Sequence, residues 1–241
     1  MKLCCSSRAY ARALQSGSLT QLEWVDRCAE LALDGVDFAA SHFPRTDSDY
    51  LAQLKKLCAD RGLTAACAAV DVPFGDGDVD QQAAVLEEWI GRCVALGAPL
   101  LRFRAGSASG TPAIAWRELV RGLKRSTAAA KDRNVTLALE PCSQTLVETP
   151  ADAKRVMKEC DSAWLRLALP LACFEAEAFA QWEAAVDDAV IVTAQGGEAA
   201  SLPSLRRTGY IGFITIESSG TDEDAALVAA LGRLRADAPA R

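Results

Sequence analysis

Short apolar segments alternate with longer amphipathic segments along the whole chain. The apolar segments are typical of strands that are buried on both faces of a parallel sheet, because they lack the alternation of a half-exposed strand. The segments between them place apolar residues at helical spacing. The predicted strands are Leu3–Ser7, Val36–Ala40, Leu63–Val70, Pro99–Arg104, Val135–Glu140, Trp164–Leu169, Ala189–Ala194 and Ile211–Glu217.

Capping signals mark where the helices between these strands begin. Thr20 is a suitable N-cap with Glu23 three residues further on, and Gly35 ends the element before the second strand. Thr149 followed by Pro150 has the same meaning before a later helix. The other predicted helices are Asp47–Arg61, Gln81–Leu96, Ala113–Arg133, Phe174–Ala185, Ala199–Arg207 and Asp222–Arg235, and Arg8–Gly17 is expected to be a loop or a short helical turn.

Strand–helix units repeated in series predict an α/β fold, a single (β/α)8 TIM barrel that forms one domain over residues 1–241. An open doubly wound sheet is the competing fold. It is disfavoured because no glycine-rich phosphate loop follows any early strand. In a TIM barrel the functional residues lie at the carboxyl ends of the strands.

Charge and cysteine content narrow the function classes. The formal net charge of −6 argues against a nucleic-acid partner, and no apolar run approaches the roughly 20 residues of a membrane helix. Nine cysteines, an odd number without a CxxC pair, sit mostly in apolar patterns. They indicate reduced, buried thiols and a cytoplasmic protein, and we expect no signal peptide because no apolar stretch follows the first residues.

Two of the predicted strands end on a carboxylate. Val135–Glu140 is followed by Pro141, and the last strand closes at Glu217. An acid at the end of a buried strand is costly unless it is paired, hydrogen-bonded or bound to a cation. We expect Glu140 and Glu217 to face each other across one end of the barrel and to be the catalytic residues.

Further polar residues are expected at the same end of the barrel. Strand alternation places Arg102 and Arg104 on one side of the fourth strand, and Gln195 follows the seventh. We predict that these three residues bind substrate, with an arginine able to clamp a carboxylate or phosphate. A structural interpretation stays open. In it the two glutamates are relics that hydrogen-bond to the backbone or pair with an arginine. The arginines are then an ion-pair partner and a rim charge, and Gln195 is a plain loop residue.

With these segments in view, the chain resembles the xylose isomerase-like barrel family of sugar-phosphate isomerases and epimerases. The segments that carry the resemblance are Leu19–Glu23, Ala29–Phe38, Ala95–Ala98, Leu137–Pro141, Thr149–Pro150 and Gly209–Glu217. The resemblance implies that His42, just past the second strand, contacts substrate. The endonuclease branch of the fold needs many histidines and is rejected, because His42 is the only one.

The resemblance also implies a metal site, and here the chain departs from the pattern. Active members bind a divalent cation through Glu, Asp, His and Glu after strands five to eight. Glu140 and Glu217 match the two glutamates, whereas the other positions read Leu169–Ala172 and Thr193–Gly196. We therefore expect a divalent cation, Mn²⁺ or Mg²⁺, to be weakly bound or absent.

Two opposed carboxylates can remove a proton next to a carbonyl and return one elsewhere. The leading hypothesis is thus an enzyme, an isomerase or epimerase of a small carbohydrate or keto acid, that uses carboxylate-mediated proton transfer. A non-catalytic barrel that binds a sugar-like ligand or a partner subunit is the alternative. A lyase or dehydratase of the same fold is a further one. A homo-oligomer is compatible with the sequence.

Overall fold

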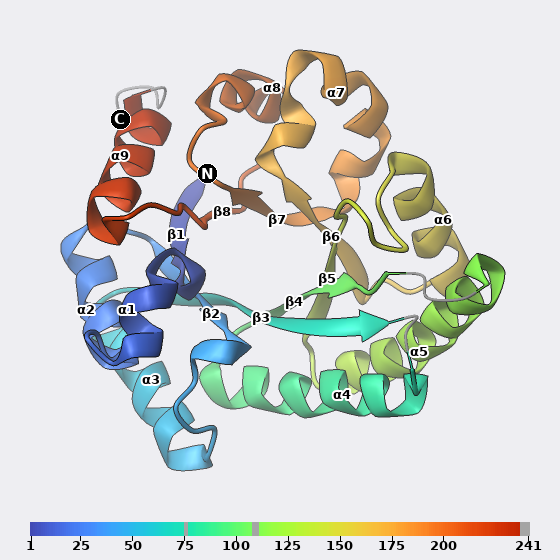
Figure 1. Cartoon of the computed structure of the whole chain (residues 1–241), viewed down its shortest axis with the longest axis horizontal. Helices are drawn as coiled ribbons and strands as arrows, with labels where there is room; N and C mark the ends of the chain where they lie inside the picture. Colours follow the sequence, from blue (N-terminus) through green and yellow to red (C-terminus); the bar gives the residue numbers. More distant parts are fainter. Residues whose placement is uncertain (75–76, 108–110, 237–241) are drawn as a thin grey trace.

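The computed structural model describes residues 1–74, 77–107 and 111–236. Within these residues, eight parallel strands close into a barrel in which each strand pairs with the next and β8 returns to β1 (Figure 1). The strands are β1 (Lys2–Ser6), β2 (Gly35–Ala39), β3 (Thr64–Phe74), β4 (Leu100–Ala105), β5 (Thr136–Glu140), β6 (Leu165–Pro170), β7 (Ala189–Ala194) and β8 (Phe213–Ile216). The predicted fold class is confirmed.

Helices surround the barrel and connect successive strands (Figure 1). The α-helices are α1 (Ala11–Ser16), α2 (Gln21–Glu30), α3 (Ser48–Asp60), α4 (Val79–Leu96), α5 (Pro112–Asp132), α6 (Pro150–Cys160), α7 (Ala176–Trp182), α8 (Leu202–Arg207) and α9 (Glu223–Ala236). Short 3₁₀ turns are η1 (Ser7–Tyr10), η2 (Ala40–His42), η3 (Leu171–Phe174), η4 (Glu183–Asp188) and η5 (Ala199–Ser201). No helix in the described part of the chain has both the length and the apolar composition to cross a membrane.

The predicted capping residues form hydrogen bonds at the N-termini of α2 and α6. Thr20 accepts a hydrogen bond from the Glu23 backbone, and the Glu23 carboxylate accepts one from the Thr20 backbone in return. Thr149 and Asp152 form the same reciprocal pair at the start of α6. Both helices therefore begin where the sequence predicts, because the capping residues satisfy backbone N–H groups that have no partner inside the helix.

Several element boundaries differ from the sequence prediction. The helix expected over Phe174–Ala185 is divided among η3, α7 and η4, and β3 continues past Val70 because it pairs further with β4. The last strand begins at Phe213 instead of Ile211, and the Tyr210 hydroxyl donates a hydrogen bond to the Phe213 carbonyl at this start.

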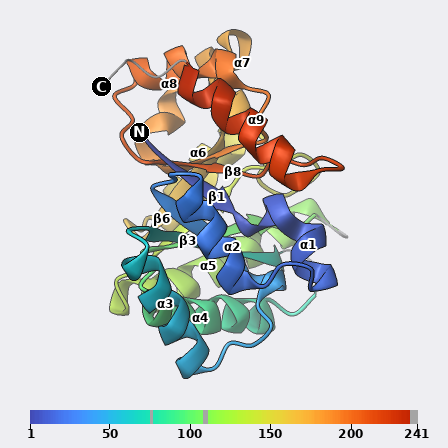
Figure 2. The ribbon, with the colours of Figure 1, turned by 90° about the vertical axis from the view of Figure 1, so that its left-hand side faces the viewer.

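The last helix, α9, forms hydrogen bonds with two elements near the start of the chain. Asp224 of α9 accepts hydrogen bonds from Arg27 of α2 and from the Tyr10 hydroxyl of η1. Figure 2 shows α9, α1 and α2 on the side of the barrel that faces the viewer. The last helix thus packs near the place where β8 pairs with β1 and closes the barrel.

Small side chains fill the inside of the barrel below its polar mouth. A compact apolar cluster of Cys67, Ala138, Ala168 and Ile191 is buried there, separate from the larger core between strands and helices. The residues paired with Arg102 in the flanking strands are Ala69 and Ala138. Because both neighbours are alanines, a long arginine side chain fits inside the barrel beside them.

Enlarging this interior should therefore be costly. We expect Ala138→Leu to lower the free energy of unfolding by about 1–3 kcal/mol, because added methyl groups must displace Arg102 or distort β5. Ala128→Leu, on the exposed face of α5, is the control and should change it by less than about 0.5 kcal/mol. Urea unfolding of both variants measures the difference, and equal effects would contradict this account of the interior.

Candidate active site

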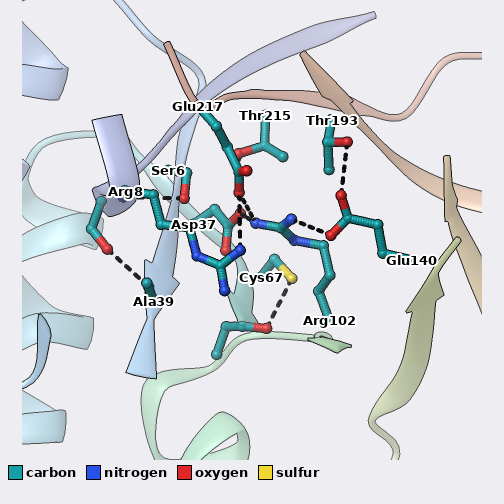
Figure 3. Close-up of polar contacts among 12 residues, drawn as sticks. Ser6, Arg8, Asp37, Ala39, Cys67, Arg102, Glu140, Thr193, Thr215 and Glu217 are labelled. Atoms are coloured by element: carbon teal, nitrogen blue, oxygen red, sulfur yellow. Dashed lines mark hydrogen bonds and ion pairs between the residues drawn. The ribbon is translucent and has the colours of Figure 1, made fainter. Parts of the chain in front are cut away.

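The polar end of the barrel is organised around the guanidinium of Arg102 on β4. Among the described residues, three carboxylates from three other strands bind it (Figure 3). Arg102 donates to Glu140 Oε2 at 2.8 Å, to Asp37 Oδ2 at 2.8 Å and to Glu217 Oε1. Arg102 is only 1% exposed and Asp37 is fully buried. The two strand-terminal glutamates therefore converge at one place, on a shared cation.

Arg104 binds the same glutamate from the solvent side. Its Nε and Nη2 donate to the two oxygens of Glu140, both at 2.9 Å, and its Nη2 lies 3.9 Å from Glu217 Oε2. The Arg104 side chain keeps 33% of its surface exposed. The two arginines thus lie on the same side of β4, as alternation requires, with Arg102 inside the barrel and Arg104 at the mouth.

Two threonine hydroxyls complete the inner shell. Thr193 of β7 donates to Glu140 Oε1 at 3.3 Å, and Thr215 of β8 donates to Asp37 Oδ2 at 3.1 Å. Glu140 accordingly accepts four hydrogen bonds, which is about the full capacity of a carboxylate. Glu140 is held as a structural anion whose oxygens are all engaged.

Arg8, just after β1, forms the opposite rim of the mouth. Its Nη2 donates to both oxygens of Asp71, at 3.1 and 3.2 Å, and its Nη1 lies 3.7 Å from Glu217 Oε1. Asp71 is largely exposed. Arg8 and Arg104 therefore place two partly exposed positive charges on either side of Glu217.

His42 lies beside this rim and outside the carboxylate cluster. The Ser7 hydroxyl accepts a hydrogen bond from the Ala39 backbone and lies 3.0 Å from His42 Nδ1. Burial and the nearby Arg8 charge lower the pKa of His42, which favours the neutral imidazole at neutral pH. His42 also lines a cavity of about 570 Å³ together with Gln21 and Phe43. Contact of His42 with substrate stays a prediction.

Burial and charge pairing act in opposite directions on the buried acids. Burial raises the pKa of Asp37, and the Arg102 guanidinium offsets this only in part. Burial also works against ionisation of Glu140, yet Arg102 and Arg104 together hold the pKa of Glu140 below its ordinary value. Desolvation opposes the charge on Arg102, but the carboxylates keep its pKa above the usual range of arginine. Glu140 and Arg102 are thus a fixed ion pair at neutral pH.

The structure separates the residues that sequence reasoning proposed. Glu140, Glu217, Arg102 and Arg104 come together. The Gln195 side chain is exposed, and the backbone N–H of Gln195 donates a hydrogen bond to Glu198. Arg102 has carboxylate partners on both terminal nitrogens, so the contacts match the structural interpretation of this residue. Substrate binding by Arg102 and Gln195 stays a prediction without a contact that supports it.

Asp37 and Arg8 were missed from the sequence. Asp37 carried a usable signal, since it is an acid within the apolar run Val36–Ala40, the same feature that drew attention to Glu140. Arg8 follows directly after the first strand, at the carboxyl end where TIM barrels place functional residues. Neither residue could be paired with its partners without the barrel.

The arrangement does not fit the divalent cation that the resemblance implies. Hydrogen bonds from a guanidinium already engage Glu140 and Glu217, and a second positive ion would be repelled at this short range. Leu169 is fully buried and offers no ligand atom. No group of three or more His, Cys, Asp or Glu among the described residues is arranged to hold a metal. We therefore derive no step through a metal ion.

Removing the central cation should be far more costly than removing a surface one. We expect Arg102→Met to lower the free energy of unfolding by roughly 3–5 kcal/mol, because it leaves buried carboxylates without a counterion. Arg121→Met, which breaks exposed ion pairs on α5, should cost less than about 1 kcal/mol. Urea denaturation provides the comparison, and similar losses in both variants would refute the central role of Arg102.

The pKa shifts predict pH dependences of opposite sign for two variants. Because the folded pKa of Glu140 is lowered, its contribution is present above its unfolded value of about 4.3 and is lost as the pH falls below it. The gap in unfolding free energy between the wild type and Glu140→Gln should therefore shrink from neutral pH to about pH 3. Since the folded pKa of Asp37 is raised, the wild type should gain relative to Asp37→Asn over the same range. Gaps that do not change with pH would contradict the assigned shifts.

Comparisons with known proteins agree with this architecture. The family model described as xylose isomerase-like TIM barrel matches residues 25–192, and no curated protein sequence matches significantly. Among solved structures, L-ribulose 3-epimerase has a TM-score of 0.80 and 19% identity, covering 98% of this chain and 95% of that chain. D-psicose 3-epimerase has a TM-score of 0.79 and 16% identity, covering 98% of both chains. 3-Keto-D-glucoside 4-epimerase from E. coli has a TM-score of 0.78 and 17% identity, covering 98% of this chain and 99% of that chain. The family match spans most of the chain, and the closed barrel has the fold of these neighbours: the protein belongs to the xylose isomerase-like TIM barrel family.

Proposed function

We propose that the protein isomerises a small carbohydrate or hydroxy-keto acid at the mouth of the barrel by carboxylate-mediated proton transfer. One observation carries the proposal. Glu217 lies at the carboxyl end of β8 beside two partly exposed arginines, and no hydrogen bond from a described residue reaches its Oε2. Arg104 Nη2 lies 3.9 Å from this oxygen, beyond hydrogen-bond distance. Glu217 therefore keeps one oxygen available for a proton.

The two glutamates have different roles in this proposal. Glu217 Oε2 takes the proton from the carbon next to the substrate carbonyl. Glu140 has every oxygen engaged and a lowered pKa, so that it is a poor proton donor and instead fixes Arg104 in place. Arg104 and Arg8 are positioned to pair with the negative charge that develops on the substrate oxygens, or with a carboxylate or phosphate on the substrate.

A single base favours isomerisation over two-sided epimerisation. Once the abstracted proton has exchanged with solvent, Glu217 can give a proton to the adjacent carbon, while the hydroxyl proton moves to the former carbonyl oxygen, and the overall charge is unchanged. Epimerisation needs a second acid on the opposite face of the substrate. Glu140 does not supply this acid, because it is ionised and accepts hydrogen bonds on both of its oxygens.

The solved neighbours support the choice of substrate class. Their names describe epimerases that act on ribulose, psicose and a keto-glucoside. At identities below 20% these names are a reason to test ketoses first, and they do not decide the substrate.

The cysteines support a cytoplasmic location as part of this proposal. Among the described residues all nine cysteines are free thiols, and a reducing compartment would keep them so.

Ligand binding without turnover is the second candidate, and one observation favours it. Arg102 and Glu140 are bound to one another and buried, so that much of the polar mouth is occupied by its own ion pairs. In this version the exposed rim of Arg8 and Arg104 recognises the ligand and Glu217 only anchors Arg102. A lyase would share the first proton abstraction and would differ in its product.

Solvent-deuterium incorporation tests the catalytic proposal. The wild type is incubated in D₂O with a panel of ketoses and hydroxy-keto acids, and recovered compounds are analysed by NMR and mass spectrometry. We expect deuterium at the carbon next to the carbonyl in at least one compound, and Glu217→Gln should slow its incorporation by about 100-fold or more, since the base is lost. Glu88→Gln, an exposed acid on α4, is the matched control and should leave the rate unchanged.

Two results would contradict the proposal. Incorporation that continues at the wild-type rate in Glu217→Gln would remove the assigned base. No incorporation into any compound, together with saturation-transfer NMR signals from one of them, would favour ligand binding without turnover. Analysis of the products also separates an isomer from the dehydrated compound that a lyase would release.

A further inference from the structure

We propose that the guanidinium of Arg102 is the permanent cation of this site and occupies the space that a divalent ion would need among the carboxylates. The protein would thereby carry its own counterion in place of an exchangeable metal. This inference concerns the cation that holds the carboxylates together. It can therefore be tested whether or not the protein turns over a substrate.

The geometry of the carboxylates is the first support. Asp37 on β2, Glu140 on β5 and Glu217 directly after β8 meet at a single group. Asp37 and Glu217 both accept from the same nitrogen, Nη2 of Arg102 (Figure 3). Carboxylates drawn this closely to one point repel one another unless a positive charge lies between them.

Burial makes the counterion obligatory. Arg102 is 1% exposed, Asp37 is fully buried, and the side chains of Glu140 and Glu217 are each 5% exposed. Water cannot replace the cation there, and carboxylates crowded together out of water repel one another. Arginine is protonated at every physiological pH, so this positive charge cannot be lost by deprotonation. The site is therefore charged whether or not metal ions are available.

Two polar atoms of the cluster leave hydrogen-bonding capacity unused. Asp37 Oδ1 and Arg102 Nε are buried without a hydrogen-bond partner among the described residues. If the Arg102 side chain were shortened, Asp37 Oδ1 and the oxygens of Glu140 and Glu217 would line the vacated space. That space should accept a divalent cation with oxygen ligands.

The structural test compares Mn²⁺ binding by the wild type and by Arg102→Ala. We expect millimolar Mn²⁺ to leave the melting temperature of the wild type unchanged and isothermal titration to detect no site. Arg102→Ala should melt at lower temperature and gain several degrees on addition of Mn²⁺, with one ion bound per chain, because the ion restores the missing charge. Arg102→Ala combined with Glu217→Gln should lose most of this gain. Arg121→Ala, which removes a surface cation, should show no response.

The wild type and a conservative variant keep the test decisive if Arg102→Ala does not fold without metal. Refolding of Arg102→Ala that requires Mn²⁺ would support the proposal. Arg102→Lys keeps a positive charge and should fold without binding Mn²⁺. One Mn²⁺ bound by the wild type and lost in Glu217→Gln would overturn the proposal, and so would a folded Arg102→Ala that ignores Mn²⁺. If Arg102→Ala folds under no condition, absence of Mn²⁺ binding in the wild type and in Arg102→Lys supports the proposal, and binding by either refutes it.

Discussion

The structure of the barrel mouth depends on one buried ion cluster, the guanidinium of Arg102 with the carboxylates of Asp37, Glu140 and Glu217. Each of these charges would be costly alone, since burial disfavours an ion that has left water. Together they fix four strands of the barrel relative to one another at their carboxyl ends. The cluster also determines which groups stay available for chemistry, because it engages Glu140 fully and leaves one oxygen of Glu217 without a hydrogen bond.

The rest of the fold makes room for this cluster. Alanines flank Arg102 in both neighbouring strands, and the apolar layer beneath consists mostly of small side chains. Above the cluster, Arg104 and Arg8 carry positive charge to the surface of the mouth. Arginines thus extend from the buried centre to the rim, and each of them is paired with a carboxylate.

Within the xylose isomerase-like TIM barrel family, this arrangement is a different solution to a shared electrostatic problem. Carboxylates gathered at the end of a barrel need a positive partner, and either a bound metal ion or a side chain can supply it. A metal ion can be exchanged and can bind substrate oxygens directly. A buried guanidinium is permanent and directional, and carboxylates already use its terminal nitrogens here.

The amino-acid sequence was sufficient to predict the barrel, because strand and helix periods, capping residues and turn glycines are local properties of the chain. It also indicated that Glu140 and Glu217 are unusual, since each ends an apolar strand. Only the tertiary structure decided what neutralises them. The partner, Arg102, is 38 residues from Glu140 and 115 from Glu217 along the chain, and Asp37 joins from β2. Contacts between residues so far apart depend on barrel closure and strand register, which no local pattern encodes.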